Sequence, residues 1–147
     1  MPGINVVVSS ASLSLEILKT TQGELTCKKE YSVREAASSK NLSIVFSEYE
    51  GYPVHTYKDD RSLILIEGLI YNKSDSLIQS ELGAVIEDFI NNQDYKRGIR
   101  DFIDTSDGEY LILVCLKDSG DILVFNDRWA RLPVFYSVQD DRFVLSR

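Results

Sequence analysis

The sequence has little of what common catalytic and metal-binding sites require. It contains one histidine, His55, and two cysteines, Cys27 and Cys115, in 147 residues. These residues do not have the number or spacing of a Cys/His zinc site, and a Ser-His-Asp or Cys-His catalytic site would have to use His55. His55 lies in an alternating stretch, where a side chain that faces solvent is the simpler interpretation. Cys115 lies inside an apolar run and is expected to be a buried hydrophobic residue.

Other absences exclude further classes of protein. The glycines Gly83, Gly98 and Gly108 are isolated, so no phosphate-binding or dinucleotide-binding loop is present. The net charge of −7 argues against nucleic acid as a partner. The longest apolar run, residues 110–116, is far shorter than the roughly 20 residues of a membrane span, and the N-terminus lacks the basic start of a signal peptide. We therefore expect a cytoplasmic, metal-free protein that binds neither nucleic acid nor membrane.

Period-2 patterns predict strands in the first half of the chain. The predicted strands cover residues 5–9, 13–18, 42–46, 54–57 and 62–71. Residues 9–12 are interpreted as a hairpin turn between the first two strands. Residues 28–40 are polar and weakly patterned, which favours a loop with one helical turn. A turn is expected at residues 59–60.

The pattern changes to a helical period after Asn72. Apolar residues then recur every three or four positions, which is typical of one face of an amphipathic helix. Ser76 and Gln79 have the spacing of a capping box that would start this helix near Leu77, and residues 91–92 would end it. A shorter helix is predicted over residues 94–103. Four strands follow, over residues 109–117, 121–125, 133–138 and 142–145, so the fold class is α+β with mostly antiparallel sheet and one domain over residues 1–147.

Several stretches resemble the N-terminal glutaminase domain of the asparagine synthetase family, a class II glutamine amidotransferase with the N-terminal-nucleophile fold. The stretch L-S-I at residues 42–44 is similar to the family's R-L-S-I, and E-G-L-I-Y-N at residues 67–72 is similar to N-G-E-I-Y-N. The stretches D-G-E-Y (107–110), N-D-R (126–128) and P-V-F-Y (133–136) follow in the family's order. The resemblance covers essentially the whole chain. It implies a four-layer αββα sandwich of two mostly antiparallel sheets.

The sequence departs from the family where the resemblance implies catalysis. Active members carry a cysteine nucleophile after the initiator Met, whereas this chain has Pro2, which has no side-chain heteroatom. Asn41 replaces the arginine that clamps the glutamine carboxylate, and Glu67 replaces the asparagine of the oxyanion hole. Gly68 retains the glycine of the oxyanion hole. The aspartate that holds the substrate amine corresponds to Glu81 or, equally defensibly, to Asp75.

The resemblance therefore implies a vestigial pocket and no catalytic residue. The residues assigned to this pocket are Pro2, Asn41, Glu67, Gly68 and Glu81. Glu67 is expected to be buried at the end of a central strand, with Asn41 and the backbone near Pro2 as candidate donors. Residues 63–71 and 110–116 are expected to form adjacent or facing strands of the core, because both are continuously apolar.

Two hypotheses about function follow. In the first, the domain lacks glutaminase activity and packs on an asparagine-synthetase-like amide-forming domain, in the same chain or in another subunit. The domain itself then needs no cofactor, and ATP and Mg²⁺ belong to the synthetase domain. Residues 1–147 would in one form be the N-terminal part of a longer chain; a homodimer is an open alternative. In the second hypothesis, the old glutamine pocket takes a different ligand, and the N-terminal amine of Pro2 acts as a base or forms an imine.

Overall fold

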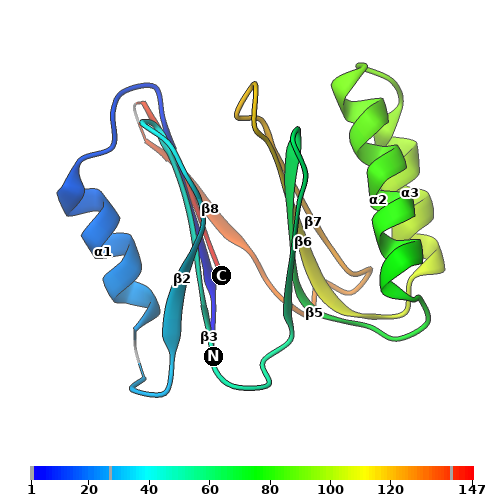
Figure 1. Cartoon of the computed structure of the whole chain (residues 1–147), viewed down its shortest axis with the longest axis horizontal. Helices are drawn as coiled ribbons and strands as arrows, with labels where there is room; N and C mark the ends of the chain where they lie inside the picture. Colours follow the sequence, from blue (N-terminus) through cyan, green and yellow to red (C-terminus); the bar gives the residue numbers. More distant parts are fainter. Residues whose placement is uncertain (1, 27, 140) are drawn as a thin grey trace. The chain divides into compact units, whose positions relative to one another are not determined.

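The protein is an α+β protein with two antiparallel sheets. The computed structural model describes residues 2–26, 28–139 and 141–147, and these residues form nine strands and three helices. The chain divides into two compact units, one of residues Met1–Thr56 with Pro133–Arg147 and one of residues Tyr57–Leu132. Each unit contains one sheet, with one helix beside the sheet of the first unit and two beside that of the second (Figure 1). The predicted α+β class and antiparallel pairing are confirmed.

The first unit is built on a five-stranded sheet in the order β2-β3-β1-β9-β8. Every strand pair in it is antiparallel. Helix α1 contacts β1 and β3, in the middle of the sheet. The elements are β1 (Ile4–Ser9), α1 (Leu15–Leu25), β2 (Ser32–Ser38), β3 (Leu42–Glu48), β8 (Phe135–Gln139) and β9 (Arg142–Ser146).

Three predictions in this unit are wrong. Residues 9–12 were expected to form a hairpin turn, but they connect β1 to a helix. Residues 13–18 were expected to form a strand, but they enter α1, whose first turn is capped by Ser14: its Oγ accepts a hydrogen bond from the Ile17 N–H at 3.3 Å. Residues 28–40 were expected to form a loop, but they contain the edge strand β2. That strand is mostly exposed and polar, so its extended form comes from pairing with β3 and leaves little hydrophobic pattern in the sequence. Residues 139–141, between the last two predicted strands, have the composition of a turn, and Asp140 among them lies outside the described residues.

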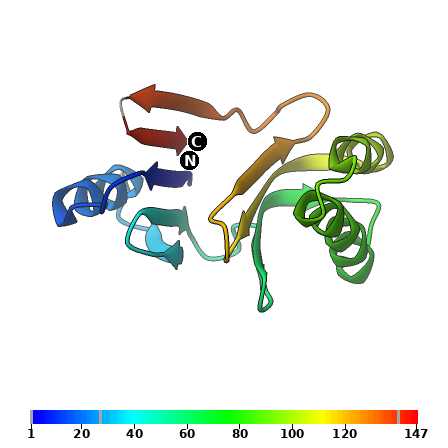
Figure 2. The same cartoon turned by 90° about the horizontal axis from the view of Figure 1, so that it is seen from above.

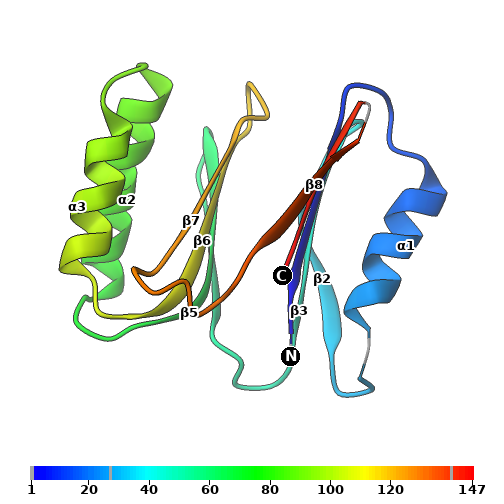
Figure 3. The same ribbon diagram turned by 180° about the vertical axis from the view of Figure 1, so that it is seen from behind.

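The second unit is built on a four-stranded sheet in the order β4-β5-β6-β7. The boundary between the two units falls inside β4, its first strand. Strands β5 and β6 pair antiparallel along nine residues, from Ser62↔Leu116 to Ile70↔Gly108, which confirms the predicted adjacency of residues 63–71 and 110–116. Helices α2 and α3 lie side by side on one face of this sheet (Figure 3). The elements are β4 (Val54–Lys58), β5 (Ser62–Ile70), α2 (Asp75–Ile90), α3 (Tyr95–Thr105), β6 (Gly108–Leu116) and β7 (Ile122–Asn126).

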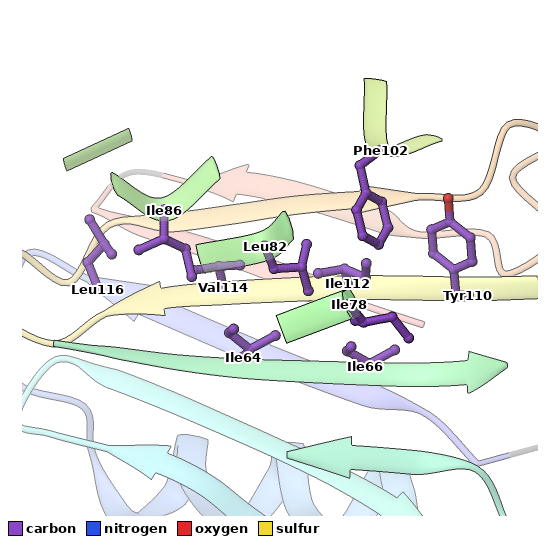
Figure 4. Packing of buried hydrophobic residues seen from close by; sticks show 10 residues of the cluster. All are labelled: Ile64, Ile66, Ile78, Leu82, Ile86, Phe102, Tyr110, Ile112, Val114 and Leu116. Atoms are coloured by element: carbon purple, nitrogen blue, oxygen red, sulfur yellow. The ribbon is translucent and has the colours of Figure 1, made fainter. Parts of the chain in front are cut away.

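The core of the second unit lies between this sheet and the two helices. The predicted apolar face of α2 is the face that is buried, and its residues Ile78, Leu82 and Ile86 pack on inward side chains of β5 and β6 (Figure 4). Helix α2 begins two residues earlier than predicted, because Ser74 and not Ser76 is the N-cap. The core cluster consists of Ile64, Ile66, Ile78, Leu82, Ile86, Phe102, Tyr110, Ile112, Val114 and Leu116.

Candidate functional site

Pro2 lies two residues before the start of β1 and is buried. Its carbonyl oxygen accepts a hydrogen bond from Arg147 Nη1 at 2.8 Å. The next residue, Gly3, donates its N–H to Ser47 Oγ and accepts the Ser47 N–H, both at 2.9 Å. A Cβ at Gly3 would come within 2.1 Å of the Arg147 carbonyl oxygen, so a side chain cannot be accommodated there. The backbone on both sides of position 2 is thus hydrogen-bonded to the sheet, yet the side chain of Pro2 has no heteroatom that could act as a nucleophile.

Asn41 lies at the opposite end of the β1–β3 pair from Pro2. The register pairs Ile4 with Phe46 and Val8 with Leu42, so Asn41 is opposite Ser9, whose N–H bonds the Asn41 carbonyl at 2.9 Å. Pro2 and Asn41 are therefore separated by the length of β1, which is roughly 20 Å at ~3.3 Å per residue. The side chain of Asn41 is exposed, and its Oδ1 accepts a hydrogen bond from Ser39 Oγ. The structure does not bring Asn41 into the surroundings of Pro2, and the expected shared pocket does not include it.

Glu67 and Gly68 are consecutive residues of β5. Glu67 is buried, with 1% of its surface exposed, as the sequence predicts. Since side chains alternate along a strand and Ile66 points to the helices, Glu67 points to the face of the sheet away from α2 and α3. Gly68 has φ +95, and a Cβ there would come within 1.9 Å of the Glu109 carbonyl oxygen. Only glycine fits this close approach of β5 to β6.

Glu81 is paired with a cation of the chain itself. Its carboxylate accepts a hydrogen bond from Lys73 Nζ, and the same ammonium donates to Thr105 Oγ1 at 2.8 Å. The ammonium also lies 4.5 Å from the centroid of the Phe102 ring, and the Lys73 side chain is only 4% exposed. The carboxylate of Glu81 is therefore paired within the chain. The other candidate, Asp75, is an exposed residue in the first turn of α2.

A small cavity lies at the end of the second sheet, where two of the resembling stretches, residues 107–110 and 126–128, meet. It has a volume of about 150 Å³, and its lining includes Asp107, Asp127 and Arg131. Asp127 is 5% exposed, and its carboxylate accepts the N–H groups of Trp129 at 2.9 Å and Arg131 at 3.2 Å. Arg131 in turn lies 3.9 Å from Asp127 and 3.4 Å from Glu109. Asp127, Arg131 and Glu109 therefore pair with one another, and this arrangement shapes the loop after β7.

This cavity shows what the sequence analysis missed. The stretch N-D-R at residues 126–128 was assigned only as part of a resemblance, without a role for its aspartate. The signal that was available is an aspartate at the end of a strand, since Asx side chains commonly accept N–H groups of a following turn. The second missed contact is Asn72, whose Oδ1 accepts the Asp107 N–H at 2.8 Å while its Nδ2 donates to the Thr105 carbonyl at 2.9 Å. Asn72 thereby joins the ends of β5, α3 and β6.

The histidine and the described cysteine match their predictions. His55 is exposed on β4. Cys115 is 2% exposed, and burial raises the pKa of its thiol, so it is not a thiolate nucleophile near neutral pH. Within the residues that the structure describes, no group of three or more His, Cys, Asp or Glu side chains is arranged to hold a metal ion.

Comparison with protein-family models, with curated proteins and with solved structures finds no match to this chain. Among the described helices, none combines the length and the apolar character needed to cross a membrane.

Proposed function

We propose that this chain is a glutaminase-like domain without catalytic activity that packs on and supports an asparagine-synthetase-like, ATP-dependent amide-forming domain or subunit. The observation that carries the proposal is the proline at position 2, two residues before the first strand. Glutamine hydrolysis by the N-terminal-nucleophile mechanism needs a side-chain thiol at that position, with the α-amine of the same residue as base. The side chain of proline has no thiol or hydroxyl that can form the acyl-enzyme.

Glu67 supports the same conclusion. Its carboxylate stands where the resemblance implies an amide donor to the oxyanion. An ionised carboxylate only accepts hydrogen bonds, so it would destabilise a negative tetrahedral intermediate. Gly68 supplies a backbone N–H at most, and one backbone donor without a nucleophile does not hydrolyse an amide.

The fold part of the proposal is the four-layer αββα arrangement of the N-terminal-nucleophile hydrolases. It is supported by the two antiparallel sheets, by helix α1 beside one of them and helices α2 and α3 beside the other, and by a first strand that begins two residues after Pro2. The register that separates Asn41 from Pro2 counts against a carboxylate clamp at Asn41. The proposal therefore rests on Pro2 and Glu67 and does not use Asn41.

A glutaminase assay tests the loss of activity. The purified chain is incubated with glutamine, and glutamate release is measured beside a glutaminase domain that carries an N-terminal cysteine. We expect release from this chain to equal the uncatalysed background. Glutamate release above background that disappears in Pro2→Ala or Glu67→Ala would overturn the proposal, because it would assign catalysis to these positions.

A reconstitution assay tests the supporting role. The partner is found as an S-G-G-x-D-S-type ATP-pyrophosphatase sequence that adjoins this one in the reading frame or the gene neighbourhood. We expect the two to co-purify, and we expect ammonia-dependent amide formation by the partner with ATP and Mg²⁺ to fall when this chain is left out. Equal activity and stability of the partner with and without the chain would contradict the supporting role. A thermal-shift screen with amines and amino acids tests the altered-ligand alternative, since a ligand that binds the folded state raises the melting temperature.

A further inference from the structure

A cavity of about 250 Å³ lies in the second unit, between helix α2 and the hairpin of β4 and β5. Figure 2 shows α2 on the side of the second sheet where β5 lies, and α3 on the side of β6. The floor of the cavity includes the core residues Ile64 and Ile86, which are 6% and 4% exposed. Arg61 and Glu87, which are about half exposed, also line it and form an ion pair with each other. The cavity therefore has an apolar floor and a charged mouth.

Gly83 of α2 keeps this cavity open. It lies in the interior of the helix, where glycine is destabilising relative to alanine because its backbone loses more conformational freedom. Among the described residues, a Cβ at Gly83 would meet no atom within 4 Å apart from its chain neighbours and the backbone of its own helix. By contrast, a Cβ at Gly98 of α3 would come within 3.0 Å of Val85 Cγ2, so that glycine serves the packing of the two helices. What Gly83 preserves is the open space itself.

The hydrogen-bonding groups around the cavity favour an anionic ligand. Both lining carboxylates already have donors: Asp59 accepts the N–H groups of Arg61 at 2.8 Å and Ser62 at 2.6 Å, and Glu87 accepts a hydrogen bond from Arg61 Nη2. A guanidinium has five N–H donors and no acceptor, so the Arg61 side chain retains donors beyond its bond to Glu87. Lys58 adds a second cation to the lining. The remaining capacity of this lining is therefore for a hydrogen-bond acceptor.

We propose that this cavity binds a small carboxylic acid, with its carboxylate on the guanidinium of Arg61 and its apolar group against Ile64 and Ile86. A planar guanidinium matches a carboxylate in bidentate geometry, which explains why an arginine suits this mouth. The volume lies just below the roughly 300–1,000 Å³ of pockets that hold drug-sized ligands, so the ligand is smaller, about the size of benzoate. Gly83 leaves room for its ring, and its carboxylate competes with Glu87 for Arg61. This inference does not depend on the proposed function.

A titration with benzoate, followed by NMR of the backbone amides, tests the site. Benzamide and benzylamine have nearly the same shape without the negative charge, so they are the matched probes. We expect saturable shifts at Ser62, Gly83 and Glu87 with benzoate at millimolar concentration, and binding about tenfold weaker or less with the other two probes. Benzoate that leaves these amides unshifted, or shifts only amides elsewhere, would overturn the site. Equal binding of all three probes would overturn the preference for a carboxylate.

Filling the cavity tests the role of Gly83. The variant Gly83→Leu places a side chain in open space, so we expect it to remain folded by circular dichroism and to lose benzoate binding. The matched control is Gly23→Leu on α1, because a Cβ at Gly23 likewise meets no atom within 4 Å beyond its own surroundings in the helix. This control should bind benzoate as the wild type does. A folded Gly83→Leu variant that still binds benzoate with wild-type affinity would contradict the proposal.

Two charge variants test the contact with Arg61. Arg61→Met should weaken benzoate binding about tenfold, whereas Arg97→Met, which removes an exposed arginine of α3, should leave it unchanged. Glu87→Gln removes the internal competitor for the guanidinium and should strengthen binding about threefold. These side chains are about half exposed or more, so the variants are expected to fold. Unchanged affinity in Arg61→Met, or weaker binding in Glu87→Gln, would refute the assigned orientation of the carboxylate.

Discussion

The buried ammonium of Lys73 allows a quantitative prediction about the second unit. The variant Lys73→Met keeps the length and apolar stem of the side chain and removes the charge. The wild-type ammonium bonds Glu81 and Thr105 and lies over the Phe102 ring, and its side chain is 4% exposed. We therefore expect the variant to lose contacts that solvent does not replace.

The magnitude follows from these contacts. Hydrogen bonds to a charged group contribute about 1.5–3 kcal/mol, and a desolvated cation–π contact contributes about 2 kcal/mol. Two effects reduce the sum: the Glu81 side chain is 34% exposed and can be hydrated, and a methionine gains from burial. We expect a net loss of about 2–3 kcal/mol in the free energy of unfolding, which for a chain of this size lowers the melting temperature by about 5–10 °C.

Urea denaturation followed by circular dichroism at the helix band measures this loss. The matched control is Arg97→Met, which breaks the exposed Arg97–Asp101 pair on α3, with side chains 79% and 68% exposed. Exposed pairs four residues apart on a helix contribute about 0.3–0.5 kcal/mol, so the control should change little. The double variant Lys73→Met with Glu81→Gln should be less destabilised than the sum of its single changes. If Lys73→Met costs no more than Arg97→Met, the reasoning about the buried ammonium is refuted.

Three further predictions concern other parts of the chain. Gly68→Ala should lower the melting temperature by more than 5 °C, because the new Cβ would come within 1.9 Å of a backbone carbonyl oxygen in β6. An unchanged melting temperature would contradict the close approach of β5 to β6 at this residue. Of the two cysteines, Cys115 should react with a thiol reagent only in urea, and its rapid labelling in the native protein would contradict its burial. Backbone N–H groups of Ser62 and Arg61 lower the pKa of the Asp59 carboxyl below its ordinary value of 3.8. The ionised carboxylate therefore stabilises the folded protein above pH 3.8, and this stabilisation is lost as the pH falls through the lowered pKa. Asp59→Asn should therefore destabilise the protein at pH 7 and progressively less below pH ~4, whereas a pH-independent loss would contradict this assignment.

Local pattern determined much of this fold. The buried face of α2 followed from apolar residues at helical spacing, and the adjacency of β5 and β6 followed from two continuously apolar runs. The burial of Cys115 was predicted because it lies inside such a run, whereas that of Glu67 was expected from the resemblance together with its place in a core strand. These features depend on residues that are close in sequence, and side-chain periodicity reports them directly.

Elements with weak or misleading patterns were decided by tertiary contacts. Residues Leu15 and Ile17 suggested a strand, but the segment forms α1, which Ser14 caps and which packs on β1 and β3. Strand β2 is polar and mostly exposed, and it is extended because β3 supplies its hydrogen bonds. Neither outcome is contained in the periodicity of the segment itself, since propensity is a weak prior that packing overrides.

The candidate site shows the same division. The absence of a nucleophile at Pro2 is a property of one residue, so the sequence alone determined it. The place of Asn41 depended on the register between β1 and β3, which sets the two residues at opposite ends of a strand pair. The partner of Glu81 depended on the position of Lys73, which precedes α2 and donates hydrogen bonds both to Glu81 on α2 and to Thr105 on α3. Which side chains meet is a matter of long-range register and packing, and only the folded chain decides it.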